Sequence, residues 1–292
     1  MSIDIHTHVT LRKTVTRPDG TINTTAEELI AMLDEAGIDK AVLLPLISPE
    51  HMVQQMTTDD ILDVTAMHPD RFIPFCNIDP RGITNSPAAD FMPLLEYYKS
   101  MGCKGIGEVT ANLPFDDPRV ENMFGQVEKA GIPLLFHIGP RAGGCYGLID
   151  DLNLPKLEGA LQKFPNLVLI GHSQPFWSEI SADNTDATRN GYPKGSVTPG
   201  RVPELLRKYP NMYGDMSAGS GFNAVSRDPE FGYGFMEEFQ DKLLFGTDIC
   251  RPGQELPLPG YLRKIHDDGK ISDQAFDKIT WKNANRLLRL GL

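Results

Sequence analysis

Residues 2–9 read SIDIHTHV, and this stretch determines how the rest of the chain is interpreted. β-forming residues at alternate positions, with no turn residue between them, predict a β-strand. Because strand side chains alternate between two faces, Asp4, His6 and His8 are expected on one face of it. A carboxylate and two imidazoles at the end of a strand call for a chemical explanation, which has to come from the remaining sequence.

Short apolar runs like this one recur along the chain and predict eight β-strands. They cover residues 2–6, 40–46, 71–78, 104–109, 132–138, 166–172, 211–217 and 242–248. Several of these runs lack alternating polar residues, which is typical of strands buried on both faces of a parallel sheet.

Helical patterns fill the gaps between the predicted strands. Residues 24–37 give the clearest one, because Thr24 or Thr25 can cap its N-terminus and Gly37 can end it. Further helices are predicted over residues 87–102, 117–131 and 154–165.

The order of these elements predicts an α/β fold. Eight strand–helix units of roughly 30–40 residues fit a (β/α)8 TIM barrel, so we expect one domain over residues 1–292. An open doubly wound sheet is the alternative, but that fold favours a glycine-rich phosphate loop after an early strand. The sequence has no such loop.

Two insertions interrupt the regular alternation. Residues 10–24 alternate polar and β-branched residues around the turn motif PDG, which predicts a small hairpin flap. Residues 173–200 form a long polar loop after the sixth predicted strand. Both follow the C-terminal end of a strand, where barrel active sites lie, so each is either a lid or a surface decoration.

Composition narrows the functional classes. The chain has 292 residues, 40% of them hydrophobic, and a formal net charge of −11. The acidic balance argues against a nucleic-acid partner, because neutralising phosphates needs an excess of Lys and Arg. Scattered cysteines without a CxxC pair favour free thiols in a reducing compartment. With no basic-then-apolar leader and no apolar run of membrane-spanning length, we expect a cytoplasmic protein without membrane contact.

Titratable residues gather at the predicted strand ends. They are His6 and His8 on strand 1, Glu108 on strand 4, His137 on strand 5, His172 on strand 6, Asp215 on strand 7 and Asp248 on strand 8. The other three histidines, His51, His68 and His266, fall in predicted loops or helices. A single histidine after an apolar run is usually a core residue. So many polar groups at one rim, however, are costly to bury without a partner, and a bound cation removes that cost.

The residue types also select the metal. Imidazole and carboxylate ligands without thiolates suit Zn²⁺, with Mn²⁺ or Fe²⁺ as alternatives. His6 and His8 can reach one ion from the same strand face, and His137 and Asp248 complete the set while leaving a position open for water. Asp248 can also accept a proton from that water, and His172 can polarise a substrate carbonyl or stabilise the oxyanion. Asp4 is either a supporting carboxylate or a buried structural one.

Other residues near the expected barrel mouth carry weaker hypotheses. Arg141 and Arg251 follow His137 and Asp248 and could bind a substrate carboxylate, or they could form ordinary loop ion pairs. The aromatic residues Tyr146, Phe176 and Trp177 could line the pocket or simply cover the top of the barrel. The Cys250 thiol has no paired base in the sequence, which is weak support for a nucleophile.

The motif set resembles the amidohydrolase superfamily, in which a His-x-His on strand 1 is combined with His on strands 5 and 6 and Asp on strand 8. The finer texture resembles its amidohydrolase-related branch, which includes the aminocarboxymuconate-semialdehyde decarboxylase-like proteins. The matching stretches are GIDKAVLLP (37–45), HPDRFIPFCNIDP (68–80), FDDPRVENMFGQVEKAGIPLLFHIG (115–139), FPNLVLIGHS (164–173) and KITWKNANRLLRLGL (278–292). The resemblance implies His6, His8, His137 and Asp248 as metal ligands, with His172 catalytic or bound to a second metal.

The resemblance leaves the reaction open between hydrolysis and decarboxylation. Glu108 favours hydrolysis of a small lactone, amide or ester, because hydrolytic relatives use a strand-4 glutamate to bind or bridge metal. A second ion could then bind through Glu108, although the residue could instead hydrogen-bond a ligand histidine. The alternative is non-oxidative decarboxylation of a small unsaturated or aromatic acid.

Two further classes fit the sequence less well. A TatD-like nuclease shares the strand-4 glutamate but not the texture of the C-terminal part. A barrel that has become a binding module would not be expected to retain the ligand set. The family also implies a homodimer as a possible assembly, with a small molecule as the substrate.

Overall fold

The computed structural model describes residues 1–13, 15–17, 19–50 and 54–292. Its strands are β1 (Ile3–Thr7), β2 (Lys40–Leu43), β3 (Phe72–Pro74), β4 (Ile106–Val109), β5 (Leu134–Gly139), β6 (Leu148–Ile149), β7 (Leu169–His172), β8 (Met212–Asp215) and β9 (Leu243–Leu244). Each of the eight predicted strands is present; β1 is as long as its apolar run and shifted by one residue, the other seven are shorter than theirs, and β6 was not predicted.

The strands pair in parallel and form two sheets, β1–β2–β3 and β4–β5–β7–β8–β9, with β6 attached to β5. Backbone hydrogen bonds join the sheet edges on both sides. Lys104 N donates to Pro74 O at 2.9 Å between β3 and β4, and Ile5 N donates to Phe245 O at 2.9 Å beside β9. The arrangement is a TIM barrel, as the sequence predicted.

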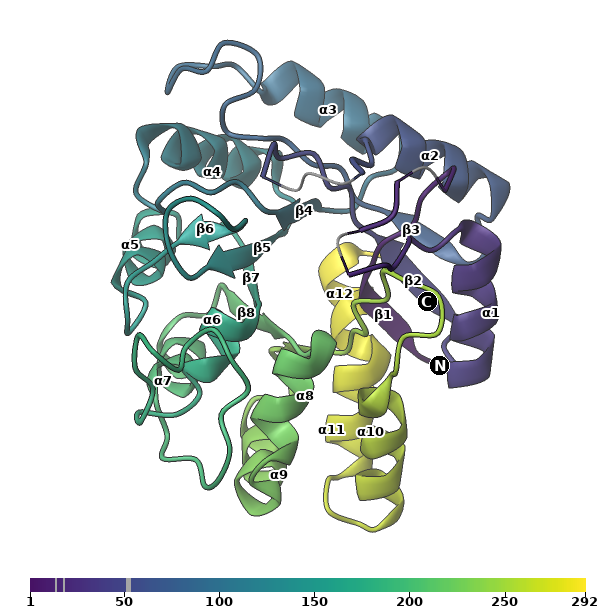
Figure 1. The fold of residues 1–292 in the computed structure, drawn as a ribbon, viewed down its shortest axis with the longest axis vertical. Coiled ribbons are helices and arrows are strands. Elements are labelled where there is room, and N and C mark those ends of the chain that lie inside the picture. Colours follow the sequence, from purple (N-terminus) through teal and green to yellow (C-terminus); the bar gives the residue numbers. More distant parts are fainter. Residues whose placement is uncertain (14, 18, 51–53) are drawn as a thin grey trace.

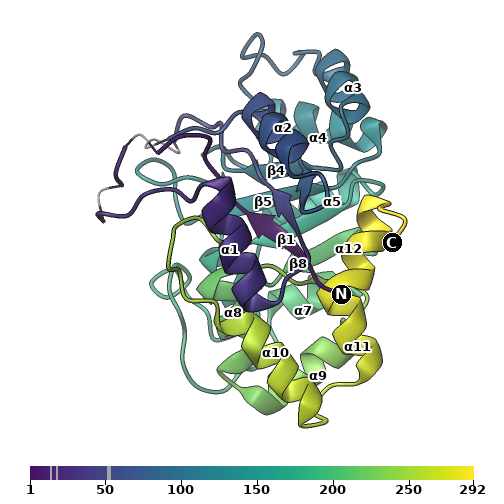
Figure 2. The ribbon, with the colours of Figure 1, turned by 90° about the vertical axis from the view of Figure 1, so that its right-hand side faces the viewer.

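Helices surround the strands (Figures 1 and 2). They are α1 (Ala26–Ala36), α2 (Thr58–Met67), α3 (Met92–Ser100), α4 (Pro118–Ala130), α5 (Pro155–Lys163), α6 (Gln174–Ser178), α7 (Arg201–Lys208), α8 (Ala218–Ser226), α9 (Pro229–Glu238), α10 (Pro257–Asp267), α11 (Asp273–Asp277), the π-helix η1 (Lys278–Lys282) and α12 (Asn283–Leu288). Within the described ranges, every helix is too short or too polar to cross a membrane.

Local sequence signals explain where α1 begins and ends. The Thr25 side chain accepts a hydrogen bond from Glu28 N, and the Glu28 carboxylate accepts one from Thr25 N at 3.0 Å, which completes a capping box. Gly37 ends the helix with a φ of 68°, a left-handed conformation that favours glycine. Both predicted helix signals are therefore confirmed, with Thr25 rather than Thr24 as the cap.

Apolar residues form two layers around the strands. A large cluster lies between the strands and the outer helices and includes Leu33, Val64 and Phe124. A smaller cluster joins strand residues such as Ile5 to Leu288 of α12, so the C-terminal helix packs against the strands. The carboxyl ends of the strands are left for polar residues.

The first insertion is a loop with a turn rather than a regular hairpin. Thr10 N donates to Thr24 O at 2.7 Å, and Arg17 N donates to Thr21 O at 2.7 Å, which holds the two sides together. The described residues of 10–24 contain no strand, and Pro18 of the PDG motif lies outside the described residues. The second insertion contains α6 and closes with an antiparallel bridge between Ser181 and Pro199.

Candidate metal centre

The structure brings four potential ligand atoms together at the carboxyl end of the barrel. His6 Nε2 and His8 Nε2 lie 3.0 Å apart. Glu108 Oε2 lies 3.6 Å from His6 Nε2 and 3.5 Å from His8 Nε2. Asp248 Oδ1 lies 3.5 Å and 3.4 Å from the same two nitrogens. A compact group of two imidazoles and two carboxylates results.

Hydrogen bonds at the other ring nitrogen, Nδ1, orient both imidazoles of this group. His6 Nδ1 lies 2.7 Å from Asp215 Oδ2 and donates to it, and His8 Nδ1 donates to Leu44 O at 3.2 Å. With the Nδ1 protons engaged, both Nε2 atoms present lone pairs to the centre of the group. Two lone pairs at 3.0 Å facing two carboxylate oxygens repel one another unless a cation lies between them.

Asp215 serves a third histidine as well. Its Oδ2 lies 3.1 Å from His172 Nδ1, and the Ser217 hydroxyl donates to the same oxygen at 2.8 Å. The carboxylate is fully buried, and Trp177 Nε1 donates to the Asp215 backbone oxygen at 2.7 Å. One side chain therefore fixes the ring orientation of both His6 and His172.

A second group lies beside the first and shares its carboxylates. Glu108 Oε1 lies 2.7 Å from His137 Nδ1 and 3.9 Å from His172 Nε2. Asp248 Oδ2 lies 4.0 Å from His172 Nε2. Each carboxylate thus directs one oxygen toward the His6–His8 pair and the other toward His172, and Glu108 also reaches His137.

The electrostatics of the centre favour positive charge. Burial opposes protonation of His6, yet the charges of Asp248 and Asp215 raise its pKa well above the ordinary value. Burial would raise the pKa of Glu108, but hydrogen bonds from His137 and His6 hold it well below the ordinary value. Although burial opposes ionisation, the neighbouring histidines also lower the pKa values of Asp215 and Asp248, so these carboxylates and Glu108 stay ionised, which is the condition for binding a cation.

The spacing of the first group fits a divalent cation. Ligands at about 2.0–2.2 Å from one ion in tetrahedral geometry lie roughly 3.3–3.6 Å from one another. The five distances given above span 3.0 to 3.6 Å, close to this range. The second group, Glu108, His137 and His172, also has its ligand atoms within 4.8 Å of one another.

Asp4 braces the strand end rather than joining the group. Its carboxylate accepts hydrogen bonds from His6 N at 3.0 Å, Thr247 N at 3.0 Å and the Thr247 hydroxyl at 2.6 Å. Burial raises the pKa of Asp4 to about 7. The register between β1 and β2 shifts between Asp4 and Thr7, so the simple alternation expected for this strand is interrupted.

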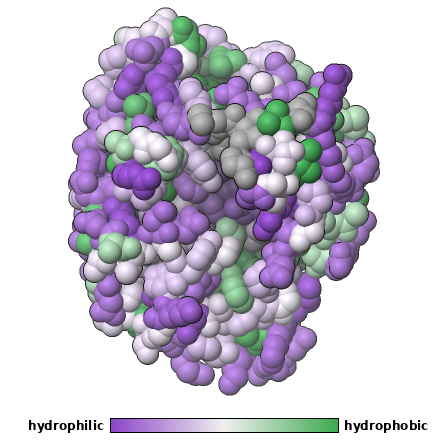
Figure 3. All heavy atoms as spheres, in the orientation of Figure 1, coloured by the Kyte–Doolittle hydropathy of each residue, from purple (hydrophilic) through white to green (hydrophobic). Residues whose placement is uncertain are grey.

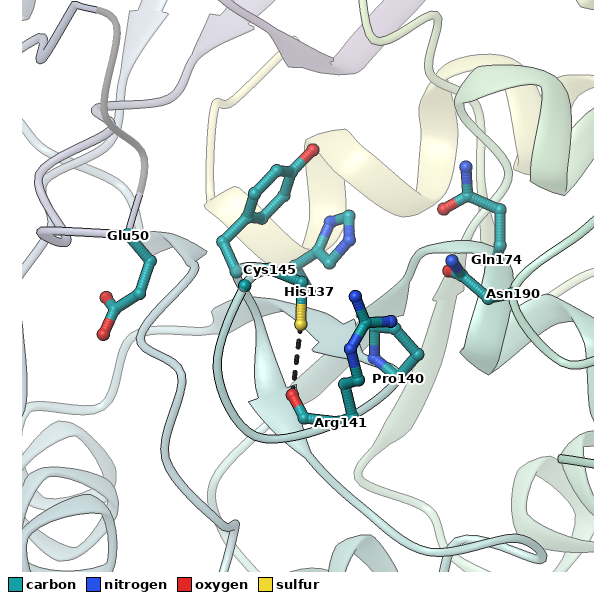
Figure 4. A pocket seen from close by; sticks show the side chains of 9 residues that line it. Glu50, His137, Pro140, Arg141, Cys145, Gln174 and Asn190 are labelled. Carbon is teal, nitrogen blue, oxygen red and sulfur yellow. Dashed lines mark hydrogen bonds between the residues drawn. The ribbon is translucent and has the colours of Figure 1, made fainter.

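A cavity of about 530 Å³ opens beside the centre. It is lined by Glu50, His137, Pro140, Arg141, Gly144, Cys145, Tyr146, Gln174 and Asn190. The Arg141 guanidinium and the amides of Gln174 and Asn190 line the same cavity as His137 (Figure 4), and Figure 3 shows a mostly hydrophilic surface on the face seen in Figure 1. Polar groups that can orient a small substrate therefore converge on the cavity.

The remaining predicted residues divide between the cavity and other places. Arg141 and Tyr146 line the cavity, and the Tyr146 ring packs on His137 with centroids 4.6 Å apart. Arg251 is exposed, and its charge acts on Asp19 and Cys250; it is not among the described lining residues.

Two further predictions concern residues that lie away from the cavity. Phe176 and Trp177 are buried in the core, so neither lines the pocket. The Phe176 ring fills the space that a side chain at Gly171 would occupy. His51 lies outside the described residues.

Several residues near the centre were not singled out by the sequence. Ser217 and the double role of Asp215 depend on contacts between strands that are far apart in the chain. Arg17, from the first insertion, donates to Cys250 Sγ at 3.3 Å and reaches the mouth of the barrel. The sequence DMS at residues 215–217 places Ser217 two positions after Asp215, at the end of the seventh predicted strand. This spacing is the one signal that could have linked Ser217 to Asp215.

Comparisons with known proteins agree with this fold. An uncharacterised TIM-barrel protein of Bordetella bronchiseptica has 19% identity and a TM-score of 0.66, with 99% of this chain and 98% of the other covered. A probable 2-pyrone-4,6-dicarboxylic acid hydrolase of Acinetobacter baumannii, with citric acid bound, has 14% identity and a TM-score of 0.60, with 99% of each chain covered.

A decarboxylase is among the similar structures too. The 5-carboxyvanillate decarboxylase of Novosphingobium aromaticivorans, complexed with manganese and 4-hydroxy-3-methoxy-5-nitrobenzoic acid, has 17% identity and a TM-score of 0.58, with 99% of this chain and 96% of the other covered. The comparison with curated protein sequences gives no match. The family model described as Amidohydrolase matches residues 3–290, and the chain therefore belongs to the amidohydrolase family of TIM-barrel enzymes.

Proposed function

We propose that this enzyme is a metal-dependent hydrolase that uses water to cleave a small lactone, amide or ester. The position of Glu108 carries the proposal, because its two oxygens face different pairs of histidines, 3.5 Å from His8 Nε2 on one side and 2.7 Å from His137 Nδ1 on the other. A carboxylate shared in this way suits a hydrolytic centre with one ion and room for a second.

The proposed ligands for the first ion are His6, His8, Glu108 and Asp248. A second ion would be held by His137 and His172, with the two carboxylates shared between the ions. Nitrogen and oxygen donors without sulfur suit zinc, manganese or iron, of which zinc is our first choice. A divalent cation bound here supplies Lewis-acid chemistry, acidifying water and polarising a carbonyl group.

Asp248 is the proposed general base. Its side chain is 26% exposed, whereas that of Glu108 is 5% exposed, so Asp248 is the more accessible of the two carboxylates at the centre. It would take a proton from water as the water oxygen bonds to the carbonyl carbon. It would then pass that proton to the leaving oxygen or nitrogen when the substrate bond breaks.

His172 is the proposed stabiliser of the carbonyl oxygen. This role is the alternative to binding a second ion: with one ion bound, Asp215 and Ser217 hold the His172 Nδ1, and an Nε2–H group would face the charge that develops on that oxygen. On the cavity wall, Arg141 would bind a substrate carboxylate. A role for Arg251 in substrate binding stays a prediction.

Decarboxylation of a small unsaturated or aromatic acid is the second candidate. The Arg141 guanidinium in the cavity supports this candidate, because a cation there would orient the carboxylate of an acid substrate. It would orient the carboxylate of a lactone equally well. The two reactions differ in their products, so one assay can separate them.

The test combines metal analysis with a substrate panel. We expect the purified enzyme to bind zinc, manganese or iron, and the His6→Ala variant to lose metal and activity together. We expect hydrolysis of lactones such as 2-pyrone-4,6-dicarboxylate or of amides, without CO₂ release from carboxylated aromatics. Surviving activity in His6→Ala, or CO₂ release without hydrolysis, would contradict the proposal.

A further inference from the structure

The loop after β5 forms most of the cavity wall and has little structure of its own. Residues 139–147 read GPRAGGCYG, and Gly143 and Gly144 have φ angles of 73° and 67°. Five of the nine residues lining the cavity come from this loop. Because so much glycine favours many backbone conformations, something outside the loop has to hold its shape.

Gly147 N donates to Thr110 O at 2.7 Å, and the Asn112 side chain makes most of the other contacts that hold the loop from outside. Asn112 Oδ1 accepts a hydrogen bond from Gly143 N at 2.6 Å. Asn112 Nδ2 donates to Arg141 O at 3.0 Å and to Gly147 O at 3.2 Å. One amide therefore uses its acceptor and both donors on three points of the same loop.

These contacts determine where two cavity side chains lie. Arg141 and Tyr146 are both on the segment between the points that Asn112 binds, and the Tyr146 ring packs on His137 at 4.6 Å. Asn112 itself follows Glu108 by four residues on the chain segment leaving β4. The wall of the cavity is thus tied directly to the strand that supplies the shared carboxylate.

We infer that Asn112 is a positioning residue, which fixes the loop so that Arg141 and Tyr146 select and orient the substrate. This inference rests on the proposed function for the claim that the cavity takes the substrate. The claim that Asn112 holds the loop is independent of the proposed function. The residue acts through the loop and not by contact with metal, because its amide is fully engaged with backbone groups.

The test uses two variants and one matched control. Asn112→Ala removes these three hydrogen bonds and also the one from Nδ2 to Cys145 Sγ at 3.7 Å. Asn112→Asp keeps the acceptor but places a carboxylate against two carbonyl oxygens. Asn122→Ala is the control, because Asn122 on α4 also donates to a backbone oxygen, Ala89 O at 2.9 Å, but lies outside the cavity lining. Metal content and thermal unfolding are measured for each variant.

Limited trypsin digestion of the metal-loaded enzyme reports the loop directly. Cleavage after the exposed Arg141 should be at least about tenfold faster in both Asn112 variants than in wild type or Asn122→Ala, because each lost hydrogen bond is worth about a factor of two to ten in loop opening. Metal content should stay at the wild-type level. Unchanged cleavage at Arg141 in both variants would overturn the inference, and so would loss of metal with the loop intact.

Kinetics separate positioning from a general structural role. With 2-pyrone-4,6-dicarboxylate as the probe, KM should rise roughly tenfold in Asn112→Ala while kcat changes much less, because uniform substrate binding is what the loop provides. An equal fall in kcat with no change in KM would contradict the inference. If the wild type hydrolyses no lactone, amide or ester, the proposed function fails, and the trypsin result still decides whether Asn112 holds the loop.

Discussion

Replacing Asp215 with Asn should weaken metal binding without removing any proposed ligand. Asp215 Oδ1 accepts from Ser217 N at 2.9 Å, so an amide at this position would keep its oxygen there and turn its NH₂ group to the other side. That other side is where Oδ2 accepts from His6 Nδ1 at 2.7 Å and from His172 Nδ1 at 3.1 Å. Both imidazoles would lose their acceptor.

The size of the effect follows from these two contacts. An imidazole that loses its Nδ1 acceptor can move its proton to Nε2, which then no longer offers a lone pair to the cation. Changing such an orienting group typically costs 10–100-fold in metal affinity, or roughly 1.4–2.8 kcal/mol. Since two rings depend on Asp215, we expect a loss near the upper end of this range.

A competition titration with zinc and a chelator of known affinity measures this loss, and elemental analysis gives the number of ions bound. Asp273→Asn is the matched control, because Asp273 also pairs with a histidine, His266 Nε2 at 2.9 Å, but its side chain is fully exposed. Thermal unfolding of both variants checks that the fold is retained. Zinc affinity of Asp215→Asn within about twofold of wild type would refute the reasoning, since it would mean that the Nδ1 contacts do not orient the ligands.

Two further predictions concern stability. Gly147→Ala should lower the free energy of unfolding by about 2 kcal/mol or more in urea titrations, because φ is 104° and a Cβ there would lie 2.4 Å from Gly139 N. Gly143→Ala is the control and should lower it less, because φ is 73° there but the space around the residue is open. Equal losses in the two variants would argue against the clash at Gly147. Hydrogen bonds from Lys208 and neighbouring groups lower the pKa of Glu158 from 4.5 to about 2, so this stabilisation is complete above pH 4.5 and is lost as the pH falls toward 2. Glu158→Gln should therefore cost about 1 kcal/mol at neutral pH and flatten the acid side of the stability curve, whereas an unchanged acid slope would contradict the assignment.

The parts of the fold that could be predicted from the sequence are those with local causes. The apolar runs became barrel strands because strands buried on both faces need continuous hydrophobic sequence. Thr25 and Gly37 marked the ends of α1 because capping uses only neighbouring backbone groups. In contrast, β6 has two residues and pairs with β5 only because the intervening loop folds back, so no periodicity announces it.

The placement of aromatic residues shows why sequence position alone is insufficient. Phe176 and Trp177 follow a strand end, as lining residues often do, but α6 directs both into the core. Gly171 permits this, because a Cβ there would lie 2.4 Å from a Phe176 ring carbon. The Trp177 indole N–H then donates to the backbone oxygen of Asp215, a contact between residues 38 positions apart.

The candidate site was predictable as a set of residues but not as a set of contacts. Strand ends of a parallel barrel meet at one rim, so the sequence could place His137 near His6 and His8. The direction of its ring is decided by packing that only the folded chain has. The Tyr146 ring packs on it at an angle of 53°, and Gly147 approaches so closely that a Cβ would lie 2.8 Å from His137 Cδ2. This packing leaves His137 Nδ1 directed at Glu108, and whether one ion or two bind therefore depends on how these two side chains share the space between them.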